Sequence, residues 1–415
     1  MPPYKKQRYD RTLKREVVTP CVSWQYRIAA LCTMFGGPFL LLYMIIRCEK
    51  NQCVLFQLPV VLPNHLSAYF SQTAIWLVLG FIVLMYLISS SKPSYNNEEI
   101  RGVLPSFSAL LTLSLILVAL TLAKPELISV LHGEYLRLFT VTLVFCVILN
   151  TTLFLLAQTN VITKEKDYCL PMAFFFGNLT QYVFGRVELK FFLYAHVGII
   201  AWGLLDLLIL LNAVLEGNVT APLIFIAVSQ YIIVAHTVFF ENFLRSRPFM
   251  ETEGLGFFWM LRVLLYLPFL HSLPVYYAAV TEVTLTKPAL MANCVFFLFG
   301  FVIYITSIHQ KENFVADPAA YKNLRSLPYF PGKRVMVSGY WGIVQKPDYL
   351  GYMIMWMAWA LACGLSGLAI LVLLVIYASM LLMLQQSIRL KKTKYGNAWS
   401  RYMSQVPYKL IPHIF

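Results

Sequence analysis

The stretch from Val337 to Gly364 reads V-S-G-Y-W-G-I-V-Q-K-P-D-Y-L-G-Y-M-I-M-W-M-A-W-A-L-A-C-G. It runs from a polar segment into an apolar one that is long enough to enter a membrane. Its first half carries Trp341, Lys346, Pro347 and Asp348, which a helix that only faces lipid does not need. Because polar residues are costly beside the hydrocarbon core, we interpret this stretch as part of a functional site at the mouth of a membrane helix.

The composition excludes a water-soluble domain. The chain has 415 residues, of which 59% are hydrophobic and 13% are charged, and its mean hydropathy is +0.67. Soluble domains carry roughly 25% charged residues. We therefore predict a polytopic membrane protein surrounded by membrane lipids. The net charge of +14 is typical of Lys and Arg in cytoplasmic loops, so we do not predict a direct nucleic-acid partner.

The apolar runs predict an all-α protein with about ten transmembrane helices. Each run is about 20 residues long, which a helix needs to cross the hydrocarbon core. The first eight runs cover about 27–46, 69–90, 104–122, 137–158, 191–215, 221–240, 256–280 and 288–308. A ninth run, about 351–386, is long enough for two helices. Gly364, Ser366 and Gly367 lie in its middle and predict a hairpin turn.

The basic residues predict that both termini lie in the cytosol. With that orientation the lumenal loops and helix ends hold only Arg47, Lys50, Lys124, Arg137 and Lys287, and nearly all other Lys and Arg residues are cytosolic. The predicted domains are then a basic cytosolic tail, 1–26, a membrane domain, 27–386, and a cytosolic C-terminal tail, 387–415. The long segments 159–190 and 309–350 both face the cytosol, where we expect chemistry or partner binding.

The cysteine pattern predicts neither a metal site nor a dense disulfide framework. Eight cysteines are scattered along the chain without a C-x-x-C pair. Cys48 and Cys53 share a predicted lumenal loop, where a disulfide and two free thiols are both open alternatives. His236 and Glu241 are five residues apart near a helix end. Two groups fall short of the three or four ligands that a metal site needs.

Arg262 stands out because it lies within an apolar run. A charged side chain at such a position usually faces protein or water. We predict that it pairs with a carboxylate such as Glu253 or with backbone carbonyls, in preference to a cofactor role.

Three stretches of the chain resemble motifs of the sterol reductase family. This family includes delta-14 sterol reductases, 7-dehydrocholesterol reductases and the membrane half of the lamin B receptor. Ser338 to Gly351 resembles the family signature S-G-W-W-G-x-V-R-H-P-N-Y-L-G, and Gln310-Lys311 with Phe314 resembles Q-K-x-x-F-R. The ending from Lys394 to Phe415 resembles K-Y-G-x-x-W-x-x-Y followed by V-P-Y-R-I-x-P-Y-I-Y. The delta-14 sterol reductases and the lamin B receptor are the closest in pattern. The resemblance implies a ten-span helical bundle of the endoplasmic reticulum or inner nuclear membrane.

The resemblance also implies a cytosolic NADPH pocket, completed by the C-terminal tail, and a sterol that enters from the bilayer. The positions in this chain that match cofactor-pocket residues of the family, or replace one of them in the case of Asp348, are Lys311, Met336, Trp341, Asp348, Tyr349, Tyr395 and Tyr402. At Asp348 the family has a neutral Asn, so a negative charge here has the wrong sign beside a ligand rich in phosphate.

Several charged and acidic family positions are replaced. The Tyr of the proton-donor segment is Ile233, and the essential Asp of a later motif falls on Ser387, so we assign no catalytic residue at these positions. The Arg that follows the Q-K-x-x-F motif is Val315. Loss of one positioned acid or base typically lowers a rate by about two to four powers of ten.

We therefore favour a catalytically impaired member of the family that retains a sterol-binding groove or acts structurally. One alternative is an active NADPH-dependent delta-14 sterol reductase whose acid site is rebuilt from His236, Glu241, His309 or Lys346. A second alternative is a sterol sensor or carrier. Lamin or chromatin proteins are left open as partners, as is the oligomeric state.

Overall fold

A computed structural model of the protein describes residues 24–414, except for 52, 55–62, 64, 91–104, 160–167, 169, 246, 248, 251–252, 319–320, 322, 331–332 and 413. Most of the predicted N-terminal tail therefore lies outside the described residues.

The first half of the chain forms helices joined by short turns and one small hairpin. Its elements are α1 (Trp24–Asn51), η1 (Leu66–Ala68), α2 (Gln72–Ser90), α3 (Pro105–Ala123), α4 (Pro125–Gly133), α5 (Tyr135–Gln158), α6 (Leu170–Phe176), β1 (Val183–Phe184), β2 (Val187–Glu188), α7 (Leu189–Phe191), η2 (Phe192–Ile199) and α8 (Ile200–Glu216). The segments α7, η2 and α8 form one continuous helical rod, in which η2 is π-helical.

The second half of the chain also forms helices joined by short connections, and it contains a second β-hairpin. Its elements are α9 (Ala221–Phe239), α10 (Asn242–Arg245), α12 (Phe257–Met260), η3 (Leu261–Leu270), α13 (His271–Thr281), α14 (Lys287–Ala316), β3 (Ser326–Phe330), β4 (Lys333–Met336), α15 (Tyr340–Ile343), α16 (Pro347–Ala362), α17 (Gly367–Tyr395) and α18 (Asn397–Gln405). Strands β3 and β4 pair antiparallel, as do β1 and β2.

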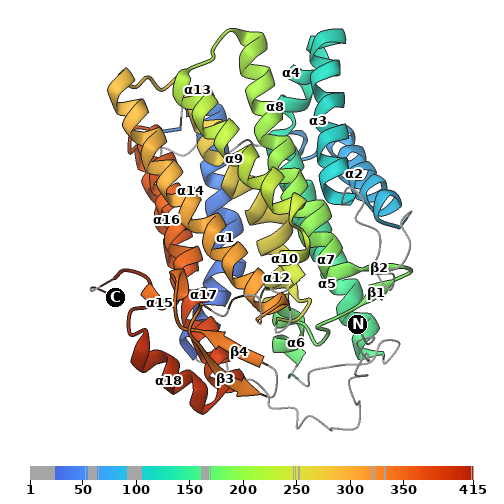
Figure 1. Ribbon diagram of the computed structural model, residues 1–415. Helices are drawn as coiled ribbons and strands as arrows, with labels where there is room; N and C mark the ends of the chain where they lie inside the picture. Colours follow the sequence, from blue (N-terminus) through green and yellow to red (C-terminus); the bar gives the residue numbers. More distant parts are fainter. Residues whose placement is uncertain are drawn as a thin grey trace.

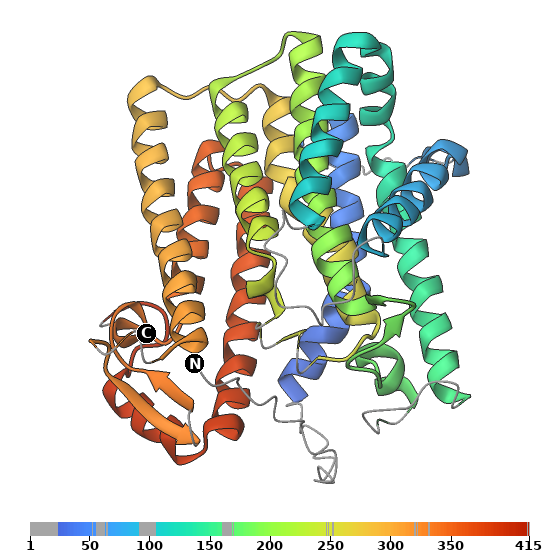
Figure 2. The same cartoon turned by 45° about the vertical axis from the view of Figure 1, so that its right-hand side comes forward.

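The long helices run side by side as a bundle, and the small elements collect at one end of it. Figure 1 shows β3, β4, α18 and α6 at the lower end of the bundle, with α15 and the β1–β2 hairpin beside the lower part of the long helices. In the turned view of Figure 2, the connections from α8 to α9 and from α13 to α14 lie at the opposite end. The two halves of the chain therefore contribute their polar segments to the same end of the bundle.

The structure confirms the helical membrane architecture. Among the described residues, eight helices are long and apolar enough to cross a membrane. The other two expected spans coincide with α1 and α16, so the count of ten stays a prediction. The hairpin is where the sequence placed it: α16 ends at Ala362, Gly364 has a φ of 69°, and the Ser366 side chain accepts a hydrogen bond from the backbone N–H of Ala369. Helix α17 then continues to Tyr395, beyond residue 386.

Two glycines allow α14 and α16 to pack closely. A Cβ atom added at Gly300 would lie 2.8 Å from the carbonyl oxygen of Gly351, and one added at Gly351 would lie 2.6 Å from the carbonyl oxygen of Gly300. Small residues of this kind let membrane helices approach until their backbones touch. The crossing fixes the position of the first turns of α16, which carry Asp348, Tyr349 and Tyr352.

Of the two alternatives for Cys48 and Cys53, the structure contains the disulfide. Cys48 and Cys53 are bonded to each other at the end of α1 that is remote from β3, β4 and α18. The backbone N–H of Cys53 also donates to the carbonyl of Arg47.

Candidate functional site

A cavity of about 460 Å³ lies inside the bundle. Its walls come from α1, η2, α8, α9, α10, α12, η3, α13, α14, α16, α17 and the segment between α10 and α12. Most of the lining is apolar, with Leu41, Met44, Ile233, Leu270 and Met383 among its residues. A concave, mainly apolar site with a few polar groups is typical of a small-molecule pocket.

One end of the cavity is charged. Nη1 of Arg247 lies 3.5 Å from Oδ2 of Asp348, a carboxylate that is only 4% exposed. Arg262 forms a two-point ion pair with Glu253, in which Nη1 lies 3.1 Å from Oε1. The predicted pairing of Arg262 with Glu253 is thus confirmed. Both arginines line the cavity, so the opposing carboxylates hold them in place at its edge.

The segment that carries Arg247 and Glu253 is fastened to the rest of the bundle. The buried Lys190 donates from Nζ to the carbonyls of Met250 and Glu253, over 2.7 and 2.6 Å. The same segment also packs closely against Gly177, where an added Cβ would lie 2.3 Å from the Leu255 carbonyl carbon. With a φ of +76°, Gly177 also adopts a conformation that favours glycine.

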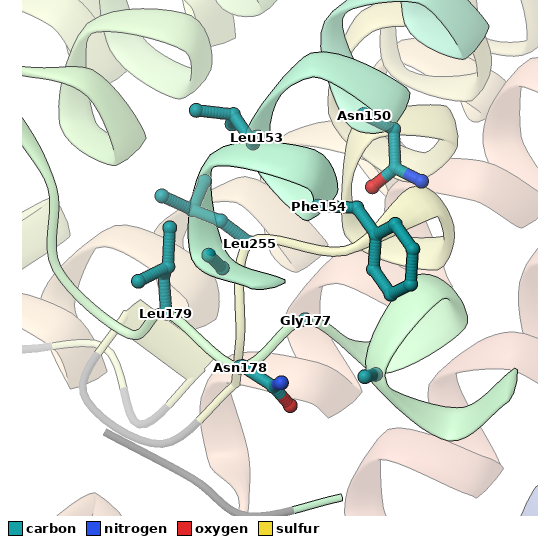
Figure 3. Close-up of a pocket in the computed structure, with 9 residues that line it drawn as sticks. Asn150, Leu153, Phe154, Gly177, Asn178, Leu179 and Leu255 are labelled. Carbon is teal, nitrogen blue, oxygen red and sulfur yellow. The ribbon is translucent and has the colours of Figure 1, made fainter. Parts of the chain in front are cut away.

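A small pocket marks where this segment meets α5. The backbone N–H of Leu255 donates to the carbonyl of Leu179 over 2.7 Å. Figure 3 shows Leu153, Leu179 and Leu255 around the pocket, with Asn150 on α5 and Asn178 on the loop. Three elements that are distant in sequence are therefore joined here, and the joint positions the charged end of the cavity.

Trp341 is the centre of the second part of the site. Its indole N–H donates to the carbonyl of Ser307 over 2.9 Å, and its own carbonyl accepts from the Tyr402 hydroxyl over 2.9 Å. Met336 packs in the same buried cluster, and Nζ of Lys311 lies 5.9 Å from the Trp341 ring centroid. Four of the predicted site residues are thus brought together, although their cofactor role remains a prediction.

The other predicted residues lie on either side of that centre. Asp348 and Tyr349 line the cavity. Tyr395 lies at the end of α17, where its ring stacks on Trp399 with a centroid distance of 6.0 Å. Ile233 lines the cavity as well, whereas Ser387 is buried in α17.

A group of lysines connects the two parts of the site. The Asp348 carboxylate interacts electrostatically with Lys346, Lys311 and Lys391 as well as with Arg247. Nζ of Lys346 lies 4.6 Å from the Tyr349 ring centroid, and burial lowers the pKa of this lysine while the Asp348 carboxylate opposes the shift. The excess of cations over carboxylates favours an anionic ligand at this end.

Lys391 is a member of the site that the sequence reading missed. Its Nζ lies 5.5 Å from the Trp341 ring centroid and 5.0 Å from that of Trp399. The spacing along α17 could have indicated Lys391. Residues four apart share one face of a helix, and Lys391 follows Ser387, a position matched to the family, by four residues. Arg247 was missed because nothing in its loop sequence indicates that the loop folds back onto α16.

Three polar residues that were considered as a rebuilt acid site lie elsewhere. His236 and His309 face each other, with 3.1 Å between their Nε2 atoms. Glu241 accepts a hydrogen bond from Ser106 and lies 4.0 Å from Nε2 of His196. None of His236, His309 and Glu241 is among the residues that line the cavity.

Residues 24–415 match the model of the ergosterol biosynthesis ERG4/ERG24 family. The delta(14)-sterol reductase TM7SF2 of Mus musculus is 27% identical over 405 residues, which cover 94% of this chain and 96% of that protein. The Arabidopsis thaliana delta(14)-sterol reductase is 27% identical over 86% of this chain and 98% of its own length. Delta(14)-sterol reductase LBR of Gallus gallus is also 27% identical, over 92% of this chain and 62% of its own length.

Proposed function

Because the chain belongs to the ergosterol biosynthesis ERG4/ERG24 family, we propose that it is a membrane protein that binds a sterol and whose capacity to reduce that sterol is impaired. The observation that carries the proposal is the cavity of about 460 Å³. This volume lies within the range of roughly 300–1,000 Å³ that is typical of small-molecule sites. Its apolar walls, which face the interior of the bundle, suit a rigid hydrocarbon skeleton.

The proposed impairment rests on two positions. Ile233 lines the cavity where related reductases have a tyrosine, and an alkyl side chain has no proton to donate. Ser387 occupies the position of an aspartate, and among the described residues its buried hydroxyl has no hydrogen-bond partner. Loss of one positioned acid lowers a rate by about two to four powers of ten, so the two losses together would leave little turnover.

An active NADPH-dependent delta-14 sterol reductase is the second candidate, and the group of cations around Asp348 favours it. Lys346, Lys391 and Arg247 suit the phosphates of a dinucleotide, because all three interact electrostatically with the buried Asp348 carboxylate and therefore lie near one another. When bound, the nicotinamide would supply a hydride. The residues of this chain would hold the phosphates, and the apolar cavity would exclude water from the sterol.

We also propose that the disulfide end of the bundle is lumenal and that the opposite end is cytosolic. Disulfides form and persist in oxidising compartments such as the lumen of the endoplasmic reticulum. The Cys48–Cys53 bond lies remote from β3, β4 and α18. This supports an orientation in which the C-terminal helix faces the cytosol or nucleoplasm, in the endoplasmic reticulum or the inner nuclear membrane.

Two measurements on purified protein in detergent test the main proposal. A delta-14 sterol is expected to bind, and incubation with NADPH is expected to leave that sterol unreduced. If expression of the protein lets a reductase-deficient cell grow without added sterol, the impairment is refuted and the second candidate is established. Absence of any sterol binding would refute the sterol-binding proposal itself.

NADPH binding by calorimetry separates the two candidates further. If the cations hold the cofactor, Lys391→Met should weaken binding by about 10- to 100-fold, since a hydrogen bond to a charged group contributes roughly 1.5–3 kcal/mol. Lys392→Met is the matched control, because Lys392 is exposed on the next position of the same helix. Equal affinities for both variants would exclude a cofactor role for Lys391.

A further inference from the structure

A hydrogen-bonded pair, His271 and Tyr352, lies in the cavity away from its charged end. The His271 Nε2 atom lies 3.1 Å from the Tyr352 hydroxyl oxygen, and both side chains line the cavity. His271 begins α13 directly after the π-helical η3, and its Nδ1 lies 3.1 Å from the carbonyl oxygen of Tyr266. The pair therefore joins two separate spans inside the membrane part of the bundle.

The partners of His271 fix the direction of both hydrogen bonds. A carbonyl oxygen only accepts, so Nδ1 carries a proton and donates to Tyr266. A neutral imidazole then has an unprotonated Nε2, which accepts the proton of the Tyr352 hydroxyl. The neutral form is the one that apolar surroundings favour. The hydroxyl oxygen of Tyr352 also interacts with the Trp356 side chain. It keeps one lone pair that can accept a further hydrogen bond from within the cavity.

The walls around this pair are aromatic. The His271 ring lies 4.9 Å from the ring of Trp202 and 5.1 Å from that of Trp356, centroid to centroid. The ring of Tyr304 lies 5.6 Å from that of Tyr352. These large side chains pack against the pair and so limit the directions that the Tyr352 hydroxyl can take.

The charged end is a different place in the same cavity. Asp348 precedes Tyr352 by four residues on α16, a separation of about 6 Å along a helix. At that end Arg247 faces Asp348 and Arg262 faces Glu253, so the charges there already have protein partners. A neutral ligand group that offers one proton is better matched by the oxygen of Tyr352 than by ion pairs.

We propose that Tyr352, oriented by His271, is the hydrogen-bonding partner of a hydroxyl group on a rigid apolar ligand. The inference rests on the proposed function, because it assumes that a sterol occupies the cavity. It assigns to that ligand a hydroxyl beside Tyr352 and a hydrocarbon body that lies along the apolar walls of the cavity. A sterol that lacks the hydroxyl should therefore bind more weakly.

A comparison of two ligands and two variants tests this assignment. Cholesterol and its 3-deoxy analogue compete for a radiolabelled sterol on the full-length protein in detergent. The wild-type protein should prefer cholesterol by about five- to tenfold, as expected for one net hydrogen bond. In Tyr352→Phe that preference should disappear, while the affinity for the deoxy analogue should stay within about twofold.

Tyr377→Phe is the matched control. The Tyr377 hydroxyl donates to the carbonyl of Met353 over 2.7 Å and does not line the cavity. This variant should keep the full preference for cholesterol. His271→Ala should reduce the preference partially, because Tyr352 would remain but lose its orientation.

The outcomes separate this inference from the proposed function. If neither sterol binds to the wild-type protein, the proposed function fails. If both bind and Tyr352→Phe retains the wild-type preference, the function stands and the assignment of Tyr352 is wrong. If Tyr194→Phe abolishes the preference instead, the hydroxyl lies at the charged end, where Tyr194 lines the cavity, and the inference is overturned.

Discussion

Replacement of Gly351 by alanine should weaken the crossing of α14 and α16. An added Cβ would lie 2.6 Å from both the carbonyl oxygen of Gly300 and the backbone nitrogen of Tyr304, and 2.9 Å from Cα of Tyr304. All three neighbours are backbone atoms, so no side chain can turn away to make room. The two helices themselves have to separate.

The contact distances give the size of the separation. Ordinary van der Waals contact begins at 3.4 Å, so the backbones must move apart by about 0.8 Å, the difference between 3.4 and 2.6 Å. Overpacking of this kind typically costs about 1–3 kcal/mol. Alanine returns up to about 1 kcal/mol through its better helix propensity. We expect a net loss of about 1–2 kcal/mol in the free energy of unfolding.

Thermal unfolding in one detergent, followed by tryptophan fluorescence, measures this loss. Gly351→Ala should unfold about 1–2 °C below the wild-type protein, because the entropy of unfolding grows with chain length. Gly80→Ala is the matched control, since Gly80 lies in α2 and an added Cβ there meets nothing within 4 Å. It should unfold at or slightly above the wild-type temperature. Unfolding of Gly351→Ala at the wild-type temperature would refute the tight crossing.

Two further predictions concern the cavity and the disulfide. In Gly37→Ala the new Cβ would lie 2.1 Å from the Tyr266 hydroxyl oxygen, so the Tyr266 ring must shift within the cavity wall. Sterol affinity should therefore fall by about tenfold. The control is Gly36→Ala, whose added Cβ meets nothing within 4 Å and which should bind sterol normally. Equal sterol affinities of the two variants would contradict the argument. In membranes isolated without reductant, Cys48 and Cys53 should resist a maleimide until dithiothreitol is added. Labelling before reduction would show that the bond is absent.

The sequence predicted those parts of the fold that depend on local pattern. The apolar runs indicated which segments form the long helices, although α17 continues to Tyr395, beyond the predicted end. The small residues around Gly364 indicated the hairpin, where Gly364 has a positive φ. The cost of a charge in an apolar run predicted that Arg262 would find a carboxylate, and Glu253 supplies it. Each inference used residues that are close in the chain.

The cavity could not be predicted in this way, because its polar groups come from distant elements. Arg247 reaches Asp348 across 101 positions, and the connection depends on how Lys190 and Gly177 fasten the loop. The same is true of His271 and Tyr352, which are 81 positions apart. No periodicity relates such pairs, since the packing of whole helices brings them together.

Asp348 shows how the three-dimensional arrangement changes the meaning of a substitution. By itself, an aspartate in place of a neutral asparagine disfavours a phosphate, because like charges repel. In the folded chain its carboxylate faces Arg247 and Lys346. A buried cation without such a partner would be strongly destabilising, so the aspartate stabilises Arg247 and Lys346. The effect of Asp348 on an anionic ligand therefore depends on the net charge of the whole cluster and not on this one position.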